Sequence, residues 1–171
     1  HHAFRNMAAP HGTRVMYMWV QEPVQTAGGV DPPGETPQDY SLSHPGAPNF
    51  SGLSYGRIYD ASAINTAIGM ADTNGSGVNQ IATIIPDQTS IDGQHGTHTT
   101  GIAAGSGLNN SWNPGIDIGS APLADIVFIA FDGDEDHAID ALNFIFEVAR
   151  HHNQPTVINL SFGSGRGPHD G

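Results

Sequence analysis

A strand–helix–strand pattern over residues 124–162 leaves few folds open to this chain. Residues 124–131 (ADIVFIAF) form a nearly continuous apolar run, which is typical of a strand covered on both faces. Residues 136–153 carry apolar side chains at helical spacing, with acids at the start and cationic side chains near the end. A second apolar run, TVINLSF, follows at 156–162. Two strands joined by one helix through short connections predict a right-handed parallel crossover, and therefore an open α/β sheet.

Other segments extend this prediction toward the N-terminus. RVMYMWVQ (14–21) alternates and is rich in β-forming residues, and IATII (81–85) is a short apolar run, so we expect a strand at each. SAINTAIGMA (62–71) begins with a serine that can cap a helix and predicts a short amphipathic helix. Residues 22–50 hold six of the twelve prolines, and we expect a long surface excursion outside the core.

The charge balance restricts the classes of partner. Five arginines and no lysine stand against 17 acidic residues, which gives a formal net charge of −12. Nucleic acid is excluded as a partner, because binding a phosphate backbone requires a cationic stripe. No apolar run reaches membrane-spanning length, so a membrane is not an expected partner either. The 171 residues suffice for one domain, and the absence of cysteine excludes disulfides and thiolate metal sites.

Two histidines stand three positions apart in HGTHTTGIAAG (95–105), ahead of a run of small residues. Small side chains predict a helix that passes close to the sheet, with Gly101 at the closest approach. His95 then lies at the N-terminal end of this helix, near a cleft at the sheet edge, where an imidazole can act as a general base.

This histidine motif resembles the signature of the subtilisin-like serine proteases. GSAPLADIVFIAF (119–131) and VINLSFG (157–163) are similar to two further segments of that family, and the three occur in the family's order. The resemblance implies an α/β protein with part of a three-layer αβα subtilisin-like fold and a mainly parallel sheet. It also implies that residues 1–171 are part of a single subtilase catalytic domain.

The outer segments resemble a narrower branch of the family. HHAFRN (1–6), PQDY, GRIYDASAINTAI and GPHDG are similar to bacterial subtilases related to the spore germination proteases of clostridia. An extracellular or secreted location is the expectation, with association with spores as a second option. A strongly acidic surface agrees with a soluble, extracellular protein.

The resemblance assigns roles to individual residues. His95 matches the general base, which takes a proton from a serine hydroxyl and then returns it to the leaving amine. Ser161, Phe162 and Gly163 match the strand edge that binds the substrate peptide main chain to main chain. Gly163 lets the substrate backbone approach, and Phe162 narrows or deepens an apolar pocket. His98 matches a structural position, and we expect packing or hydrogen bonding there.

Three functional groups of the family have no match in the sequence. The aspartate motif (D-T-G or D-S-G), the serine motif (G-T-S) and the oxyanion asparagine are absent. We therefore expect the segment that lies between the catalytic aspartate and serine of a serine endopeptidase, inactive by itself. Its partners are then a peptide or protein substrate and the remaining part of the catalytic domain. The alternative is a non-catalytic subtilase-like module that binds peptides or regulates another protein.

Metal sites are weaker hypotheses, and we expect no required cofactor. His95 and His98 have the spacing of a zinc pair, but the H-E-x-x-H pattern and a third ligand are missing. Residues 132–136 (DGDED) have the acidic spacing of a calcium loop without its glycine or closing glutamate, which favours a turn and helix capping. A structural calcium ion remains compatible with the family resemblance. His151 and His152 are expected to be exposed partners of the helix dipole.

Overall fold

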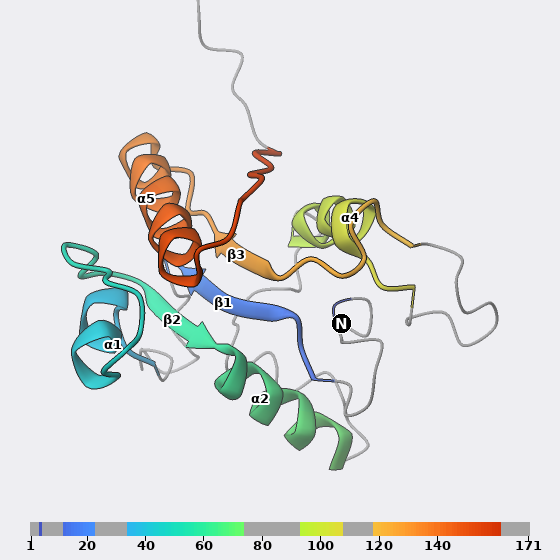
Figure 1. The fold of residues 1–171 in the computed structure, drawn as a ribbon, viewed down its shortest axis with the longest axis horizontal. Helices are drawn as coiled ribbons and strands as arrows, with labels where there is room; N and C mark the ends of the chain where they lie inside the picture. The colour runs from blue at the N-terminus through green and yellow to red at the C-terminus, as the bar shows by residue number, and fades with distance from the viewer. Residues whose placement is uncertain (1–3, 5–11, 23–33, 74–92, 108–117, 162–171) are drawn as a thin grey trace, which may run out of the picture.

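The computed structural model of the chain describes residues 4, 12–22, 34–73, 93–107 and 118–161 (Figure 1). In chain order, its elements are β1 (Val15–Val20), α1 (Pro37–Ser43), β2 (Arg57–Asp60), α2 (Ala61–Thr73), α4 (Gly93–Ala104), β3 (Ile126–Ala130) and α5 (Glu135–His152). The predicted strands at 14–21 and 124–131 are confirmed, and so are the predicted helices at 62–71 and 136–153. The expected serine cap is wrong, because α2 begins at Ala61 and Asp60 accepts from the amide of Ala63 in its place. The strand expected at 81–85 lies outside the described residues.

Within the described part of the chain, the strands form one small mixed sheet in the order β2-β1-β3. β1 pairs with β2 in antiparallel fashion, so that Trp19 lies opposite Ile58, and it pairs with β3 in parallel, so that Trp19 lies opposite Ile129. One pair of these strands, β1 with β3, is therefore parallel, whereas the expected parallel crossover joined residues 124–131 and 156–162. A mainly parallel sheet is not what these three strands make, because β2 runs the other way.

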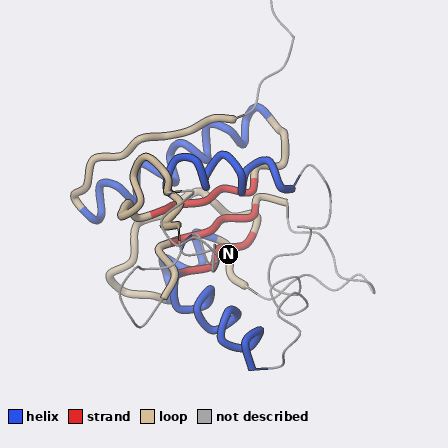
Figure 2. The backbone as a smooth tube through the Cα atoms, turned by 90° about the vertical axis from the view of Figure 1, so that its right-hand side faces the viewer, coloured by secondary structure: helices blue, strands red, loops and turns tan. Residues whose placement is uncertain are grey.

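Helices lie on both sides of this sheet (Figure 2). Successive strand residues point to opposite faces, so Trp19 enters one hydrophobic core and its neighbour Val20 enters the other. The core on the side of α1 and α5 contains Phe144 of α5, whereas the core on the opposite side contains Ile64 of α2 and Ala104 of α4. Burial on both faces explains why β1 and β3 are apolar at nearly every position.

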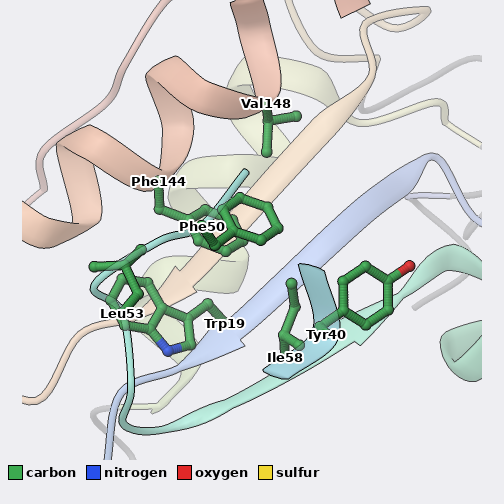
Figure 3. Packing of buried hydrophobic residues seen from close by; sticks show 7 residues of the cluster. All are labelled: Trp19, Tyr40, Phe50, Leu53, Ile58, Phe144 and Val148. Carbon is green, nitrogen blue, oxygen red and sulfur yellow. The ribbon is translucent and has the colours of Figure 1, made fainter. Parts of the chain in front are cut away.

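The core beneath α5 is strongly aromatic (Figure 3). Phe144 is fully buried, and its ring stacks on Phe50 at 4.2 Å and on Trp19 at 5.2 Å between centroids. The complete cluster is Trp19, Tyr40, Phe50, Leu53, Ile58, Phe144 and Val148. Contact among these rings fixes α5 against the sheet.

The segment 22–50, expected to stay outside the core, supplies two members of this cluster from its described part. Tyr40 is buried on α1, and Phe50 is 1 % exposed. Helix α1 begins at Pro37 because its sequence favours a helix start there. The side chain of Thr36 accepts from the amide of Asp39 as the N-cap, and proline is favoured in the first turn. The prolines therefore mark a helix start and turns between core contacts, and the expectation of a purely surface segment is wrong for residues 37–50.

The second apolar run of the crossover differs from its prediction. Over the described residues 156–161 no strand forms, and the side chains of Val157 and Leu160 are 98 % and 56 % exposed. A buried strand requires a neighbouring strand and a covering layer, and the described residues supply neither at this point.

Among the described residues, no helix is long and apolar enough to cross a membrane.

Candidate functional site

Helix α4 carries His95 in its first turn, as the sequence predicts. The imidazole is exposed, and so is that of His98 one turn later. Two threonines in the same helix satisfy their hydroxyls locally, because Thr99 donates to the carbonyl oxygen of His95 and Thr100 donates to that of Gly96. The face that carries the two histidines is therefore open to solvent in the described part of the chain.

Gly96 is the small residue at the contact between α4 and the sheet. A methyl group added there would lie 3.3 Å from the ring of Phe128 on β3, whereas one added at Gly101 would meet nothing within 4 Å. The prediction that Gly101 makes the closest approach is wrong. The close contact instead lies next to His95, where Gly96 meets Phe128 of β3.

The far end of α4 is enclosed by a loop and by an arginine. Its last four carbonyl oxygens all accept hydrogen bonds. The amide of Gly105 donates to the carbonyl oxygen of Gly101, and the guanidinium of Arg14 donates to that of Ala104. The loop donates the other two, from the amide of Ser120 to Ile102 and from the amide of Ala121 to Ala103. The loop can come this close because residue 119 has no side chain: a Cβ at Gly119 would lie 2.5 Å from the nitrogen of Gly105. The C-terminal carbonyls of α4, which a helix leaves without internal partners, are thus all satisfied.

His95 meets the segment that follows α5. Its Nε2 atom donates a hydrogen bond to the carbonyl oxygen of Ser161 at 3.1 Å, across 66 positions of sequence. The hydroxyl of Ser161 faces a different partner, since it accepts from the side-chain amide of Asn159 at 2.7 Å. Two of the four residues proposed from the sequence, His95 and Ser161, are therefore in contact. The other two, Phe162 and Gly163, lie outside the described residues.

A polar cluster that the sequence did not indicate lies where β1 and β3 end. The phenol of Tyr55 donates to Asp140 at 3.0 Å and stacks on the ring of His137 at 4.3 Å. His137 is also bound through Nδ1 to the carboxylate of Asp132 at 2.5 Å, and its carbonyl oxygen accepts from the side chain of Gln21. No local signal could reveal this cluster, because its members come from three separate parts of the chain.

The electrostatics of this cluster are consistent with its contacts. The hydrogen bond to Asp132 raises the pKa of His137, and the carboxylates of Asp132, Asp134 and Asp140 add to that effect. Burial raises the pKa of Tyr55, and the bond to Asp140 raises it further. The contacts therefore stabilise the charged form of the imidazole and the neutral form of the phenol.

The acidic segment 132–136 caps a helix. Asp134 is the N-cap of α5 and accepts from the amide of Asp136, which confirms the interpretation as helix capping. The carboxylate of Asp132 binds the imidazole of His137. Among the described residues, no group of three or more histidine, aspartate or glutamate side chains could hold a metal ion.

A comparison with protein families gives one match. A model described as the subtilase family matches residues 51–171, well over half of the chain. The matched stretch covers β2, α2, α4, β3 and α5 and includes both His95 and Ser161, whereas β1 and α1 precede it. No curated protein matches the chain.

Proposed function

Because the chain belongs to the subtilase family, a family of serine proteases, we propose that it supplies the general base and the substrate edge of a serine endopeptidase. In this role His95 takes the proton from a serine hydroxyl as the oxygen attacks the peptide carbonyl, and an acyl-enzyme forms. The imidazolium then protonates the leaving amine, and the same base activates the water that releases the product.

One contact carries this proposal. The Nε2 atom of His95 lies 3.1 Å from the main chain of Ser161, so the two residues that match the family's base and substrate edge are neighbours. An exposed imidazole beside the proposed substrate edge is accessible to a proton donor, which a general base needs within hydrogen-bond reach. Exposure of His95 also leaves room for a substrate and a hydroxyl.

The substrate in this proposal is an extended peptide. Its main chain pairs with residues 161–163, and its side chains enter pockets on alternate sides of that edge. Gly163 allows close approach of the peptide, and Phe162 shapes an apolar pocket. A net charge of −12 supports a protein or peptide substrate over nucleic acid.

We propose further that another part of the catalytic domain covers residues 156–161 and completes a three-layer fold with a mainly parallel sheet. The exposure of Val157 and Leu160 supports this, because apolar side chains of a strand sequence are costly to leave in water. That part would bring the aspartate, the serine and the oxyanion asparagine.

The narrower assignments stay predictions. Similarity of the outer segments supports a branch related to spore germination proteases, and the acidic composition supports an extracellular or secreted location. A structural calcium ion also stays a prediction, and the carboxylates of residues 132–136 are not its support because they bind protein groups.

A fluorophosphonate probe tests the proposal directly on the full-length protein. The serine oxygen of an activated serine attacks the phosphorus of the probe and fluoride leaves, so we expect covalent phosphonylation of the wild type. His95→Ala should abolish labelling, because loss of a triad histidine lowers the rate about a millionfold.

His98→Ala is the matched control, since it removes an exposed imidazole one turn further along the same helix. Labelling that survives in the His98 variant and vanishes in the His95 variant supports the endopeptidase. A folded wild type that never labels but binds a peptide would instead identify the non-catalytic module.

A further inference from the structure

Arg14 is a buried cation that joins three elements of the fold. It lies directly before β1 and is 4 % exposed. Its guanidinium donates through Nη2 to the carbonyl oxygen of Ala104, the last residue of α4, and through Nη1 to that of Ala124 at 2.6 Å, just before β3. Its own carbonyl oxygen accepts from the amide of Ile126 at 2.9 Å, where β3 starts.

The position of this cation suits the end of α4. The C-terminus of a helix has partial negative charge, and α4 has no basic residue in its last turn. Arg14 supplies the missing positive charge from another element. Burial lowers the pKa of Arg14 and nearby Asp125 opposes that shift, but a guanidinium stays protonated in proteins.

The planar fork of arginine is needed for this contact. Two of its nitrogens reach two carbonyl oxygens that belong to segments 20 positions apart in sequence, and their spacing fixes α4 relative to the start of β3. A lysine ammonium carries its three donors on one nitrogen at the end of a flexible stem, so it does not fix the spacing of two carbonyls as the planar fork does.

We propose that Arg14 is a positioning residue for His95, an inference that rests on the proposed function. Helix α4 is a stiff rod, and about 14 Å of it separates Ala104 from His95. Among the described glycines near the histidine end of α4, only Gly96 lies so close to a neighbour, the ring of Phe128, that an added side chain would be crowded. Anchoring at Ala104 therefore sets the tilt and register of the rod, and with them the distance between His95 and Ser161.

The test compares variants of the full-length protein at the two contacts that hold the C-terminal end of α4, which are Arg14 and the loop that contains Gly119. Arg14→Met removes the donors and keeps an apolar stem, and Arg14→Lys keeps the charge without the fork. Gly119→Ala disturbs the loop contact, because the added Cβ would lie 2.5 Å from the nitrogen of Gly105. Gly101→Ala is the control on the same helix, since a Cβ there meets nothing within 4 Å.

Two readouts are needed, one kinetic and one independent of activity. On a peptide substrate, well below the unfolding temperature, we expect kcat to fall about 100-fold in both Arg14 variants while KM changes little, because misplacement of a catalytic group by 1 Å has an effect of that size. In ¹⁵N-histidine spectra, the His95 signals should shift in the Arg14 and Gly119 variants and stay unchanged in Gly101→Ala.

The outcomes separate this inference from the proposed function. Folded Arg14→Lys and Arg14→Met proteins with wild-type kcat and unmoved His95 signals would overturn it, as would lower stability without any change at His95. If Arg14→Met does not fold, the lysine and Gly119 variants decide. If the wild type proves to have no peptidase activity, the proposed function fails, and the His95 spectra still show whether Arg14 sets the position of that ring.

Discussion

The Nε2 atom of His95 donates to the carbonyl oxygen of Ser161 at 3.1 Å, so the first turn of α4 is joined to the segment that follows α5. A carbonyl oxygen only accepts hydrogen bonds, and Nε2 must therefore carry a proton in this contact. A general base has to offer the same nitrogen as an acceptor to a serine hydroxyl. The described contact thus holds the ring beside the proposed substrate edge in the tautomer opposite to the one that catalysis requires.

The first prediction concerns this tautomer. In the 171-residue chain, neutral His95 should be protonated on Nε2, because Ser161 offers only an acceptor. In a protein that includes the aspartate of our proposal as the acceptor for Nδ1, the preference should reverse and free Nε2. Two-bond ¹H–¹⁵N correlation spectra distinguish the two neutral tautomers.

His98 serves as the internal reference in these spectra, because its exposed ring belongs to the same helix. A neutral His95 with its proton on Nδ1 in the 171-residue chain would contradict the contact with Ser161. The same tautomer in both proteins would count against an aspartate partner.

The second prediction concerns the aromatic core. Phe144→Ala should lower the free energy of unfolding by about 3–5 kcal/mol, because a fully buried ring stacked on Phe50 and Trp19 would leave a cavity. Phe146→Ala, two positions away on α5 and 53 % exposed, should change it by less than about 0.5 kcal/mol. Urea unfolding followed by circular dichroism measures both. Equal losses in the two variants would mean that the described face of α5 is not the packed one.

Local patterns were sufficient to predict most of the described elements. The helix predicted at 136–153 is α5 at Glu135–His152, because its apolar spacing, its acidic start and its cap all lie within one stretch of sequence. The strand predicted at 14–21 is β1 for the same reason. His95 and Ser161 were both identified from motifs, and the structure brings them together.

Features that depend on distant partners could not be predicted. The run of small residues in α4 indicates close packing but not which residue makes it, and the contact lies at Gly96 and not Gly101. The role of Arg14 depends on a helix 90 positions later in the chain. Tyr40 and Phe50 become core residues only because α1 packs on the sheet, which proline content alone does not indicate.

The third prediction concerns the four tyrosines of the chain. Burial is the first cause that raises the pKa of Tyr17, Tyr40, Tyr55 and Tyr59, and Asp60 and Asp140 add to it at Tyr40 and Tyr55. The folded state thus favours neutral phenols. The neutral phenols stabilise the folded state fully below the ordinary tyrosine pKa of about 10. This stabilisation is lost as the pH rises through the elevated pKa values of the folded protein.

Absorbance of phenolate at alkaline pH checks this prediction. The folded protein should show little phenolate near pH 10, and most of the signal should appear together with loss of the circular dichroism spectrum. In concentrated guanidinium chloride, the same titration should centre at about 10. Phenolate formation near 10 in a protein that keeps its native spectrum would contradict burial of these rings.

The last prediction concerns His137 and the dependence of stability on pH. The hydrogen bond to Asp132 raises the pKa of His137 in the folded protein above its ordinary value of about 6.5, and the charges of Asp134 and Asp140 act in the same direction. The charged imidazole therefore stabilises the fold fully below about pH 6.5, and this contribution is lost as the pH rises through the elevated value. His137→Gln should lower the unfolding temperature most at about pH 5.5 and progressively less toward about pH 9. In an Asp132→Asn background the substitution should lose most of this pH dependence, because the principal partner of the imidazole is gone. An effect of His137→Gln that is the same at every pH would show that the charged form of His137 has no part in holding the start of α5.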